Sequence, residues 1–210
     1  MQVLILSWEF PPRVVGEMAS YVNTLAIELV KKGVETYVIS FHDSWVGMHH
    51  GTDGVKAYRV TNPVTTHLNI LTWDLTLNCA FLKAASEIYH QSGTSIDVID
   101  AHEWLSVAAG VALKKAFNTP LVFTVHSLED HRSHYASTPL NIGIKSLEWL
   151  GAYEAERIVV RTPWMKNELT RIYNVPNDKV AIASSHHPNW VDEMVELYTD
   201  ARNRLGRSIG

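Results

Sequence analysis

Short apolar runs alternate with longer amphipathic stretches along the whole chain. Most of the runs are continuously apolar and rich in Val, Ile and Leu, which is typical of strands covered on both faces, as in a parallel sheet. The strands that this pattern predicts are Gln2–Ser7, Glu35–Ser40, Val55–Val60, Ile96–Asp100, Leu121–Val125, Arg157–Val160 and Lys179–Ala183.

The amphipathic stretches between these runs have the length and the period of helices. In Met18–Lys32, Val22, Leu25, Ala26 and Leu29 follow helical spacing, and Gly33 supplies a stop signal. The other predicted helices are Ile70–Tyr89, Glu103–Phe117, Pro139–Tyr153, Pro163–Tyr173 and Asn189–Leu205. This alternation predicts an α/β fold with a Rossmann-like, doubly wound parallel sheet. The turn-rich stretch Phe41–Asp53 is predicted to be a flexible excursion.

Length and composition narrow the class of protein. A chain of 210 residues suits one large α/β domain, so we expect a single domain over residues 1–210. The net charge of −4 does not favour binding to nucleic acid, which is itself negatively charged. No apolar run approaches the roughly 18 residues of a membrane span. Cys79 is the only cysteine, which excludes an internal disulfide and favours the cytoplasm. We expect its thiol to be buried and unreactive in mid-helix.

Doubly wound sheets bind ligands beyond the carboxyl ends of their strands. In the loop Trp8–Glu17, Gly16 lies where a helix opens, so backbone amides there can approach an anion. The alternative is that Gly16 only serves the geometry of a loop stiffened by Pro11 and Pro12. The dinucleotide G-x-G-x-x-G pattern and the P-loop lysine are both missing from this loop, which disfavours nicotinamide enzymes and P-loop ATPases. We expect no cofactor.

Histidines cluster in the loops that follow the predicted strands. His126 ends the strand Leu121–Val125 and should face the crevice, where it can donate a hydrogen bond to a ligand, or else pack against a neighbouring loop. A metal site built on His131 and His134 is disfavoured, because the helical context of a zinc protease and the cysteines of a structural zinc site are absent. Nucleophilic catalysis has little support, because the chain has no G-x-S-x-G motif.

Four spaced segments together resemble one known family. They are Val3–Gly16 (VLILSWEFPPRVVG), Asp100–Trp104 (DAHEW), Phe123–Ser127 (FTVHS) and Tyr153–Arg157 (YEAER). In this order they resemble the N-terminal, acceptor-side domain of retaining glycosyltransferases with the GT-B fold, in particular archaeal glycogen and starch synthases. The resemblance covers residues 1–182, and it implies a Rossmann-like half that faces a second such half across a cleft.

The resemblance implies transfer of a hexosyl group from a nucleotide sugar to a glucan. By this likeness, Gly16 would approach the donor diphosphate and Arg13 would hold the basic position of the same loop. His126 would be the catalytic residue that contacts the transferred sugar near its reacting carbon. His102 and Glu103, followed by Trp104, would line the acceptor side. Such a transfer relies on positioning and on stabilising the departing diphosphate.

The chain departs from the family pattern at three places. Glu17 stands where the family has a second glycine, and a carboxylate there would repel a diphosphate, although it also suits the first turn of a helix. Glu103 replaces an aspartate and preserves its charge. After Ile182, where the family continues into its donor domain, the chain runs directly into Asn189–Leu205, which resembles the family's terminal helix. We therefore expect a half molecule, closed by the helix of residues 189–205 and inactive alone.

Other interpretations stay open at this point. The chain could be a natural short homologue that pairs with a separate donor domain, or an engineered half. It could also be a repurposed scaffold in which Glu17 with His126, or the pair His186 and His187, does different chemistry or binds a metal. A third interpretation is an interaction module, such as a homodimer, that exposes an apolar cleft wall. The aromatic residues that we expect on this wall are Tyr21, Trp45, Trp104 and Trp164.

Overall fold

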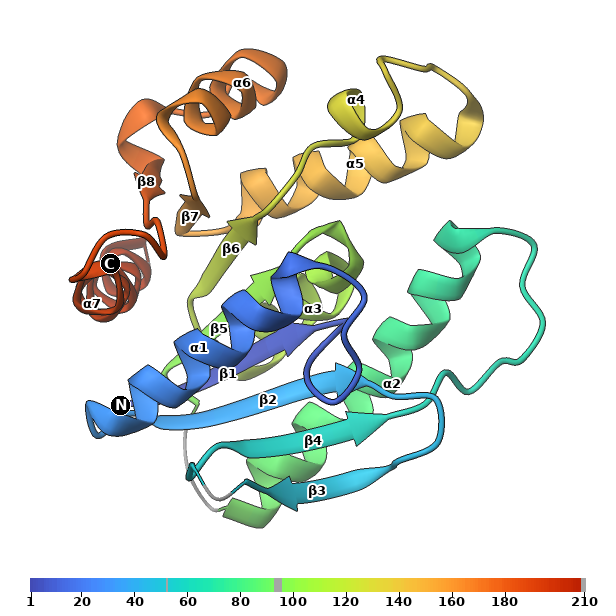
Figure 1. Ribbon diagram of the computed structural model, residues 1–210. Coiled ribbons are helices and arrows are strands. Elements are labelled where there is room, and N and C mark those ends of the chain that lie inside the picture. Colours follow the sequence, from blue (N-terminus) through green and yellow to red (C-terminus); the bar gives the residue numbers. More distant parts are fainter. Residues whose placement is uncertain (52, 93–95, 209–210) are drawn as a thin grey trace.

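A computed structural model describes residues 1–51, 53–92 and 96–208. All of its strands belong to one eight-stranded sheet with the order β3-β4-β2-β1-β5-β6-β7-β8 (Figure 1). Neighbouring strands are parallel, except for the antiparallel pair β3 and β4. The strands are β1 (Gln2–Ser7), β2 (Glu35–Phe41), β3 (Gly47–His50), β4 (Lys56–Val60), β5 (Val98–His102), β6 (Leu121–Val125), β7 (Arg157–Val160) and β8 (Val180–Ile182). The predicted parallel Rossmann-like sheet is confirmed.

Strand β3 lies in the stretch that the sequence pattern marks as flexible. Gly47 pairs with Arg59 and His50 with Lys56, so this stretch extends the sheet by one edge strand. Met48 is half-buried and His49 is exposed, so β3 carries no apolar run that would mark it as a strand. The prediction was wrong here because an edge strand needs little burial. Residue 52, in the same stretch, lies outside the described residues.

The helices cover both faces of the sheet. The longer ones are α1 (Glu17–Lys31), α2 (Ile70–Ser92), α3 (Val107–Phe117), α5 (Pro139–Glu154), α6 (Pro163–Tyr173) and α7 (Trp190–Ser208). The short ones are α4 (Glu129–Arg132) and the 3-10 turns η1 (Trp104–Ser106) and η2 (Asn177–Lys179). The helix predicted from Glu103 begins one residue later, as η1 followed by α3, because Glu103 has a φ of 63°, in the left-handed region that a right-handed helix cannot contain. None of the helices within the described ranges is long and apolar enough to cross a membrane.

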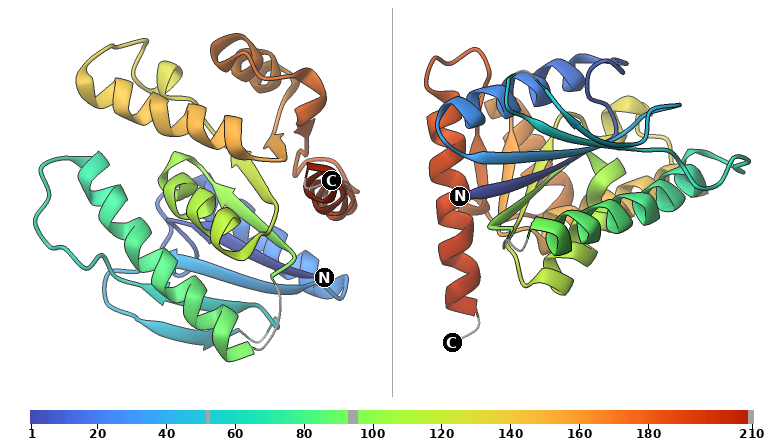
Figure 2. Two further views of the ribbon diagram at one scale, coloured as in Figure 1. Left: turned by 180° about the vertical axis from the view of Figure 1, so that it is seen from behind. Right: turned by 90° about the horizontal axis from the view of Figure 1, so that it is seen from below.

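Alternate residues of the strands enter two separate cores. In β1, Val3 and Ile5 pack with α1 and α7, whereas Leu4 and Leu6 pack with α2 and α3 on the other face. In the views of Figure 2, α1 and α2 lie on opposite sides of the sheet. Helix α7 buries the face that its sequence predicts, and this face consists of Trp190, Met194, Leu197 and Tyr198.

Cys79 differs from its prediction. Leu77 and Phe81 of α2 are fully buried against the sheet, but Cys79 lies on the other face of this helix and is exposed. The prediction of a buried thiol was wrong because it rested on the apolar neighbours in sequence and not on the helical face.

Candidate functional site

The polar residues gather at the carboxyl edge of the sheet. The strand order changes direction at β1, which lies between β2 and β5, and the loops after β1, β5, β6 and β7 meet there. A hollow of about 300 Å³ at this edge is lined by Trp8, Glu9, Glu17, Met18, Glu103, Trp104, Leu105, His126, Ser127, Arg132 and Arg161. A second hollow of about 290 Å³ shares Glu17, His126 and Arg161 with it. A larger, mostly apolar hollow beside β4 and α2 shares none of these residues.

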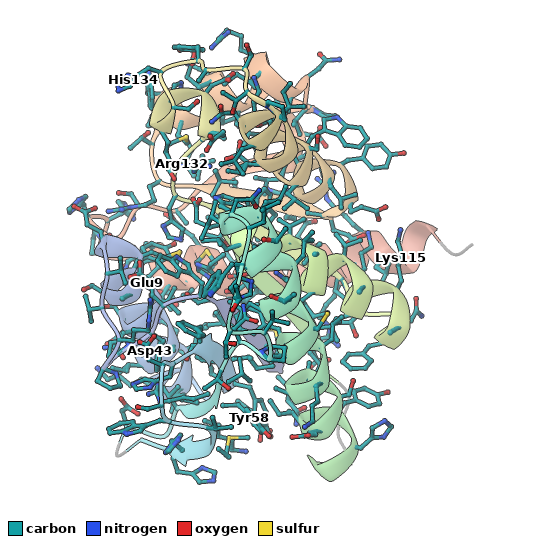
Figure 3. The ribbon with its side chains drawn as sticks, turned by 90° about the vertical axis from the view of Figure 1, so that its right-hand side faces the viewer. Glu9, Asp43, Tyr58, Lys115, Arg132 and His134 are labelled. Carbon is teal, nitrogen blue, oxygen red and sulfur yellow. The ribbon has the colours of Figure 1, made fainter. Side chains whose placement is uncertain are left out.

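Glu9 holds the loop that opens α1. Its side chain is buried, and its Oε2 accepts hydrogen bonds from the backbone amides of Val15, at 2.6 Å, and Gly16, at 2.8 Å. Figure 3 labels Glu9 between Asp43 and Arg132 along one side of the molecule. The amides that could approach an external anion, in one of the two interpretations of this loop, are therefore occupied by a carboxylate of the same chain. The sequence pattern does not predict this role of Glu9, because it depends on the direction of the side chain in the folded loop.

Two arginines at this loop, Arg13 and Arg161, have carboxylate partners. Glu17 is exposed, and its Oε2 lies 3.1 Å from an Nη atom of Arg161. Arg13 pairs with Asp43 at 3.3 Å. Its guanidinium also lies 4.9 Å from the ring centre of Trp8, in a cation–π contact. Arg13 and Gly16 are outside the lining of the two hollows, whereas Glu17 belongs to both.

Glu103 connects the end of β5 to the loop after β6. Its Oε1 accepts from the amides of His126 and Ser127, both at 2.7 Å, and its Oε2 lies 3.2 Å from the Oγ of Ser127. A φ of 63° with a ψ of 166° is a strained backbone for a residue with a side chain. The hydrogen bonds of the carboxylate help to hold Glu103 in this conformation, which fixes the position of His126.

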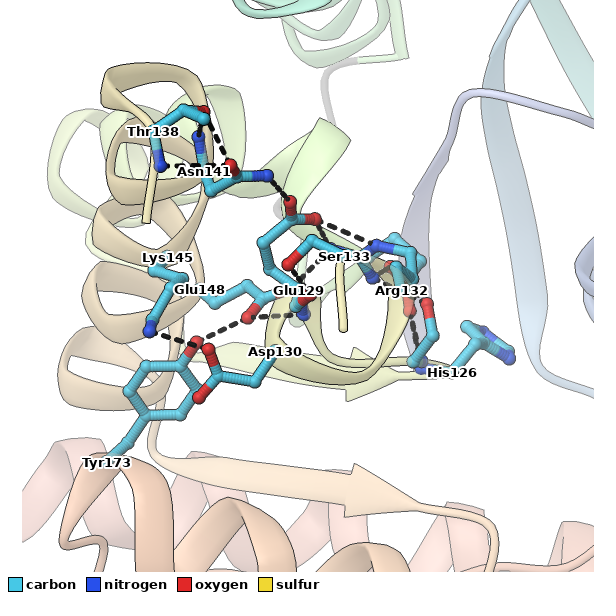
Figure 4. Close-up of polar contacts among 12 residues, drawn as sticks. His126, Glu129, Asp130, Arg132, Ser133, Thr138, Asn141, Lys145, Glu148 and Tyr173 are labelled. Carbon is cyan, nitrogen blue, oxygen red and sulfur yellow. Dashed lines mark hydrogen bonds and ion pairs between the residues drawn. The ribbon is translucent and has the colours of Figure 1, made fainter. Parts of the chain in front are cut away.

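Arg132 is surrounded by three carboxylates, of which Figure 4 labels Glu129 and Glu148. Its guanidinium lies 3.2 Å from Glu103, 3.0 Å from Glu129 and 2.6 Å from Glu148. Tyr173 donates its hydroxyl proton to Glu148. Burial raises the pKa of Glu103 and of Glu148, and the charge of Arg132 opposes that rise. The positive charge of Arg132 is thus compensated within the protein.

His126 and His102 form a stacked pair. His102 is fully buried, and its Nδ1 lies 3.0 Å from the Nε2 of His126. The ring centres are 5.3 Å apart. His126 is half-buried and lines both hollows, whereas His102 lies behind it and lines neither. Burial lowers the pKa of His126 well below its ordinary value, and His102 and Arg161 lower it further, so the ring is neutral at pH 7.

A family model described as Glycosyltransferase Family 4 matches residues 18–186. The chain belongs to glycosyltransferase family 4. This assignment agrees with the resemblance to glycosyltransferases in the sequence.

Three curated relatives support the assignment. An uncharacterized glycosyltransferase of Methanocaldococcus jannaschii is 29% identical over 100% of the chain and 52% of its own length. The glycogen synthase of Mycobacterium tuberculosis strain H37Rv is 27% identical, over 82% of the chain and 45% of the relative. The D-inositol 3-phosphate glycosyltransferase of Corynebacterium diphtheriae is 28% identical, over 90% and 44%. The chain spans about half the length of the curated relatives that it matches.

A solved structure shows the same fold. A sucrose-phosphate synthase chain from Thermosynechococcus elongatus superposes with a TM-score of 0.69 and 17% identity, over 95% of this chain and 98% of that chain. The family 4 chain therefore has the Rossmann-like half of a GT-B fold.

The aromatic residues predicted for an exposed cleft wall differ in their burial. Tyr21 and Trp104 are 4% and 6% exposed, so their prediction as surface residues was wrong. Both pack into cores, Tyr21 of α1 with Trp190 of α7 and Trp104 with Leu105 and Ile144. Trp45 and Trp164 are exposed at 53% and 58%.

Two of the histidines considered for a metal site, His131 and His187, have carboxylate partners. The Nε2 of His131 lies 2.9 Å from Glu168, and the Nδ1 of His187 lies 3.2 Å from Glu193. Within the described ranges, no group of three or more His, Cys, Asp or Glu side chains could hold a metal ion.

Proposed function

We propose that residues 1–210 form the acceptor-side wall of a glycosyltransferase site that transfers a hexosyl group from a nucleotide sugar to a neutral glucan. The observation that carries the proposal is the hollow at the carboxyl edge, where indole rings, compensated charges and the neutral His126 converge. The opposite wall would come from another domain, either in the same polypeptide or in a separate one.

The charges of the hollow favour an acceptor without a phosphate group. Arg132 is held by three carboxylates and Arg161 pairs with Glu17, so the arginines that line the hollow already have anionic partners. A phosphate would have to compete with these carboxylates. A sugar needs hydrogen-bond partners and apolar ring faces, and the half-buried Trp8 and Ser127 supply both.

The first loop is poorly suited to the donor diphosphate. Glu9 already accepts from the amides of Val15 and Gly16, and the carboxylate of Glu17 adds negative charge at the opening of α1. We infer that the opposite wall supplies most contacts to the diphosphate. Residues 1–210 would hold the acceptor and, through His126, the face of the transferred sugar. In this division of roles, the wall contributes positioning and exclusion of water rather than a nucleophile.

Titration of the chain with two acceptors tests the proposal. In amide NMR spectra, maltohexaose should shift the resonances of Trp8, Ser127 and their neighbours in a saturable manner, whereas D-inositol 3-phosphate should not. Glucose is the matched control, because it lacks the length to fill the hollow. Saturable binding of the inositol phosphate at these residues, with none of maltohexaose, would contradict the proposal and favour an anionic acceptor.

A further inference from the structure

We propose that Asp100 of β5 and Tyr198 of α7 are positioning residues that fix which nitrogen of His126 carries the proton. The functional meaning of this inference rests on the proposed function. The position of the proton itself can be measured without any sugar. It couples the last helix to the crevice through a chain of four side chains.

The four side chains form a series of contacts that runs from α7 to the hollow. The hydroxyl of Tyr198 donates to Oδ2 of Asp100 at 2.6 Å, and both residues are fully buried. The same Oδ2 lies 3.3 Å from Nε2 of His102, a contact between a carboxylate and a ring nitrogen that lacks the geometry of a hydrogen bond. The Nδ1 of His102 in turn lies 3.0 Å from Nε2 of His126. Thr124 donates to the other carboxylate oxygen of Asp100 at 2.7 Å.

The carboxylate of Asp100 selects one arrangement of protons. A hydroxyl donor on each of its oxygens suits the ionised form of a buried carboxylate. An ionised Asp100 favours a proton on Nε2 of His102, which leaves Nδ1 of His102 as a lone pair. Only one proton fits between the two rings, so it must reside on Nε2 of His126. The opposite arrangement would place a lone pair of His102 against the carboxylate.

The other groups around the pair oppose a second proton. The ring centre of Tyr21 lies 5.0 Å from that of His126, and its hydroxyl has no hydrogen-bond partner among the described residues. The guanidinium of Arg161 lies 5.7 Å from the ring centre of Tyr21, and its charge disfavours an imidazolium. The charge of Arg161 thus disfavours a second proton on His126, while Asp100 lies behind His102.

Tyr198 connects this arrangement to the docking of α7. Trp190 of the same helix packs on Tyr21, with ring centres 4.9 Å apart, so α7 contacts the surroundings of the histidine pair at two points. If α7 left the sheet, Asp100 would lose the shorter of its two hydroxyl donors. The orientation and the tautomer of the His126 ring should therefore depend on the docking of α7.

Long-range proton–nitrogen correlation spectra of the chain labelled with 15N-histidine test the inference. In the unsubstituted chain, both His102 and His126 should be protonated at Nε2. Asp100→Asn removes the charge and should produce a second population with a proton on Nδ1. Tyr198→Phe should shift the Nε2 resonance of His102 and speed the exchange of its proton. Tyr21→Phe is the matched control, because it also removes a buried tyrosine hydroxyl near the histidine pair, but one without a hydrogen-bond partner among the described residues, and it should leave the tautomer unchanged.

Two outcomes would overturn the inference. One is a proton on Nδ1 of His126 in the unsubstituted chain, and the other is an equal response to Tyr198→Phe and Tyr21→Phe. The unsubstituted chain and the two tyrosine variants decide the question if Asp100→Asn does not fold. A chain that shows the expected tautomers but does not bind maltohexaose would contradict the proposed function and support the positioning roles.

Discussion

Glu9 places a buried carboxylate against two backbone amides at the start of α1. At a helix N-terminus this is the position that an external anion would take. The hydrogen bonds to Val15 and Gly16 are short and charge-assisted, so they keep the loop closed around Glu9. Donor recognition in this chain cannot use these amides while Glu9 occupies them.

Glu17 adds a second, exposed carboxylate that can be removed without disturbing the core. We expect Glu17→Gln to release Arg161 from its ion pair. The affinity for ADP should then rise by up to about fivefold, which corresponds to the free energy of one exposed ion pair. Glu28→Gln, on the same helix and also in an exposed ion pair, is the control. Titration calorimetry at low and high salt measures the effect, which should shrink at high salt. Equal ADP affinities of the two variants would show that Glu17 does not govern the crevice.

Asp74 makes stability depend on pH in an unusual direction. Burial raises its pKa to about 8, against the hydrogen bond from Asn78. The folded chain therefore keeps a proton that the unfolded chain releases above about pH 4. The free energy of unfolding should fall as the pH rises from 4 to 8, by up to about 1.4 kcal/mol for each pH unit. Asp74→Asn should lack this loss, and urea denaturation of both chains at pH 5.5 and 8.5 measures it. Parallel pH profiles would contradict the argument.

At the scale of elements, local signals decided which predictions were correct. Strand β6 and helix α6 have the predicted bounds, because β6 is a buried apolar run and α6 begins with Thr162 as its N-cap and Pro163 at its first position. Strand β3 and the turn η1 were missed, since an edge strand needs no apolar run and the positive φ of Glu103 depends on contacts from another strand.

The candidate site could be predicted only in part for the same reason. The order of strands and loops along the chain is enough to place His126 and Glu103 at one edge of the sheet. The hydrogen bonds from the first loop to Glu9 and the contact between His102 and Asp100 could not be predicted, because they depend on the directions of side chains in space. A charged residue inside a buried strand, as at Asp100, was the one available signal for the second contact.

Helix α5 offers a matched pair of substitutions that tests its packing on the sheet. A Cβ on Gly151 would lie 2.8 Å from Val107 and 3.0 Å from the ring of Phe123, which cannot move easily. A Cβ on Gly143 would meet only the end of the Leu71 side chain. We expect Gly151→Ala to lower the free energy of unfolding by about 1–3 kcal/mol and Gly143→Ala to change it by less than about 1 kcal/mol. Thermal denaturation measures both, and equal losses would contradict this packing.

At the scale of the whole molecule, one sheet organises both cores and gathers the functional side chains at its carboxyl edge. The loops after β1, β5, β6 and β7 build an open hollow with compensated charges, which suits one side of a transfer site better than a complete one. The family 4 assignment agrees with such a role, and the matched relatives are about twice as long. The central claim is that residues 1–210 supply the acceptor wall and leave the donor diphosphate to another domain.

The most direct test combines binding and transfer for the polypeptide of residues 1–210. Calorimetry with ADP-glucose and UDP-glucose, followed by an elongation assay on maltohexaose with each donor, measures both properties on one preparation. We predict no saturable binding of either nucleotide sugar below about 1 mM. A half site would retain a binding free energy of only about 4 kcal/mol, which corresponds to a Kd of about 1 mM. We also predict no elongation of the glucan. Submillimolar binding of a nucleotide sugar together with elongation by these residues alone would contradict the account.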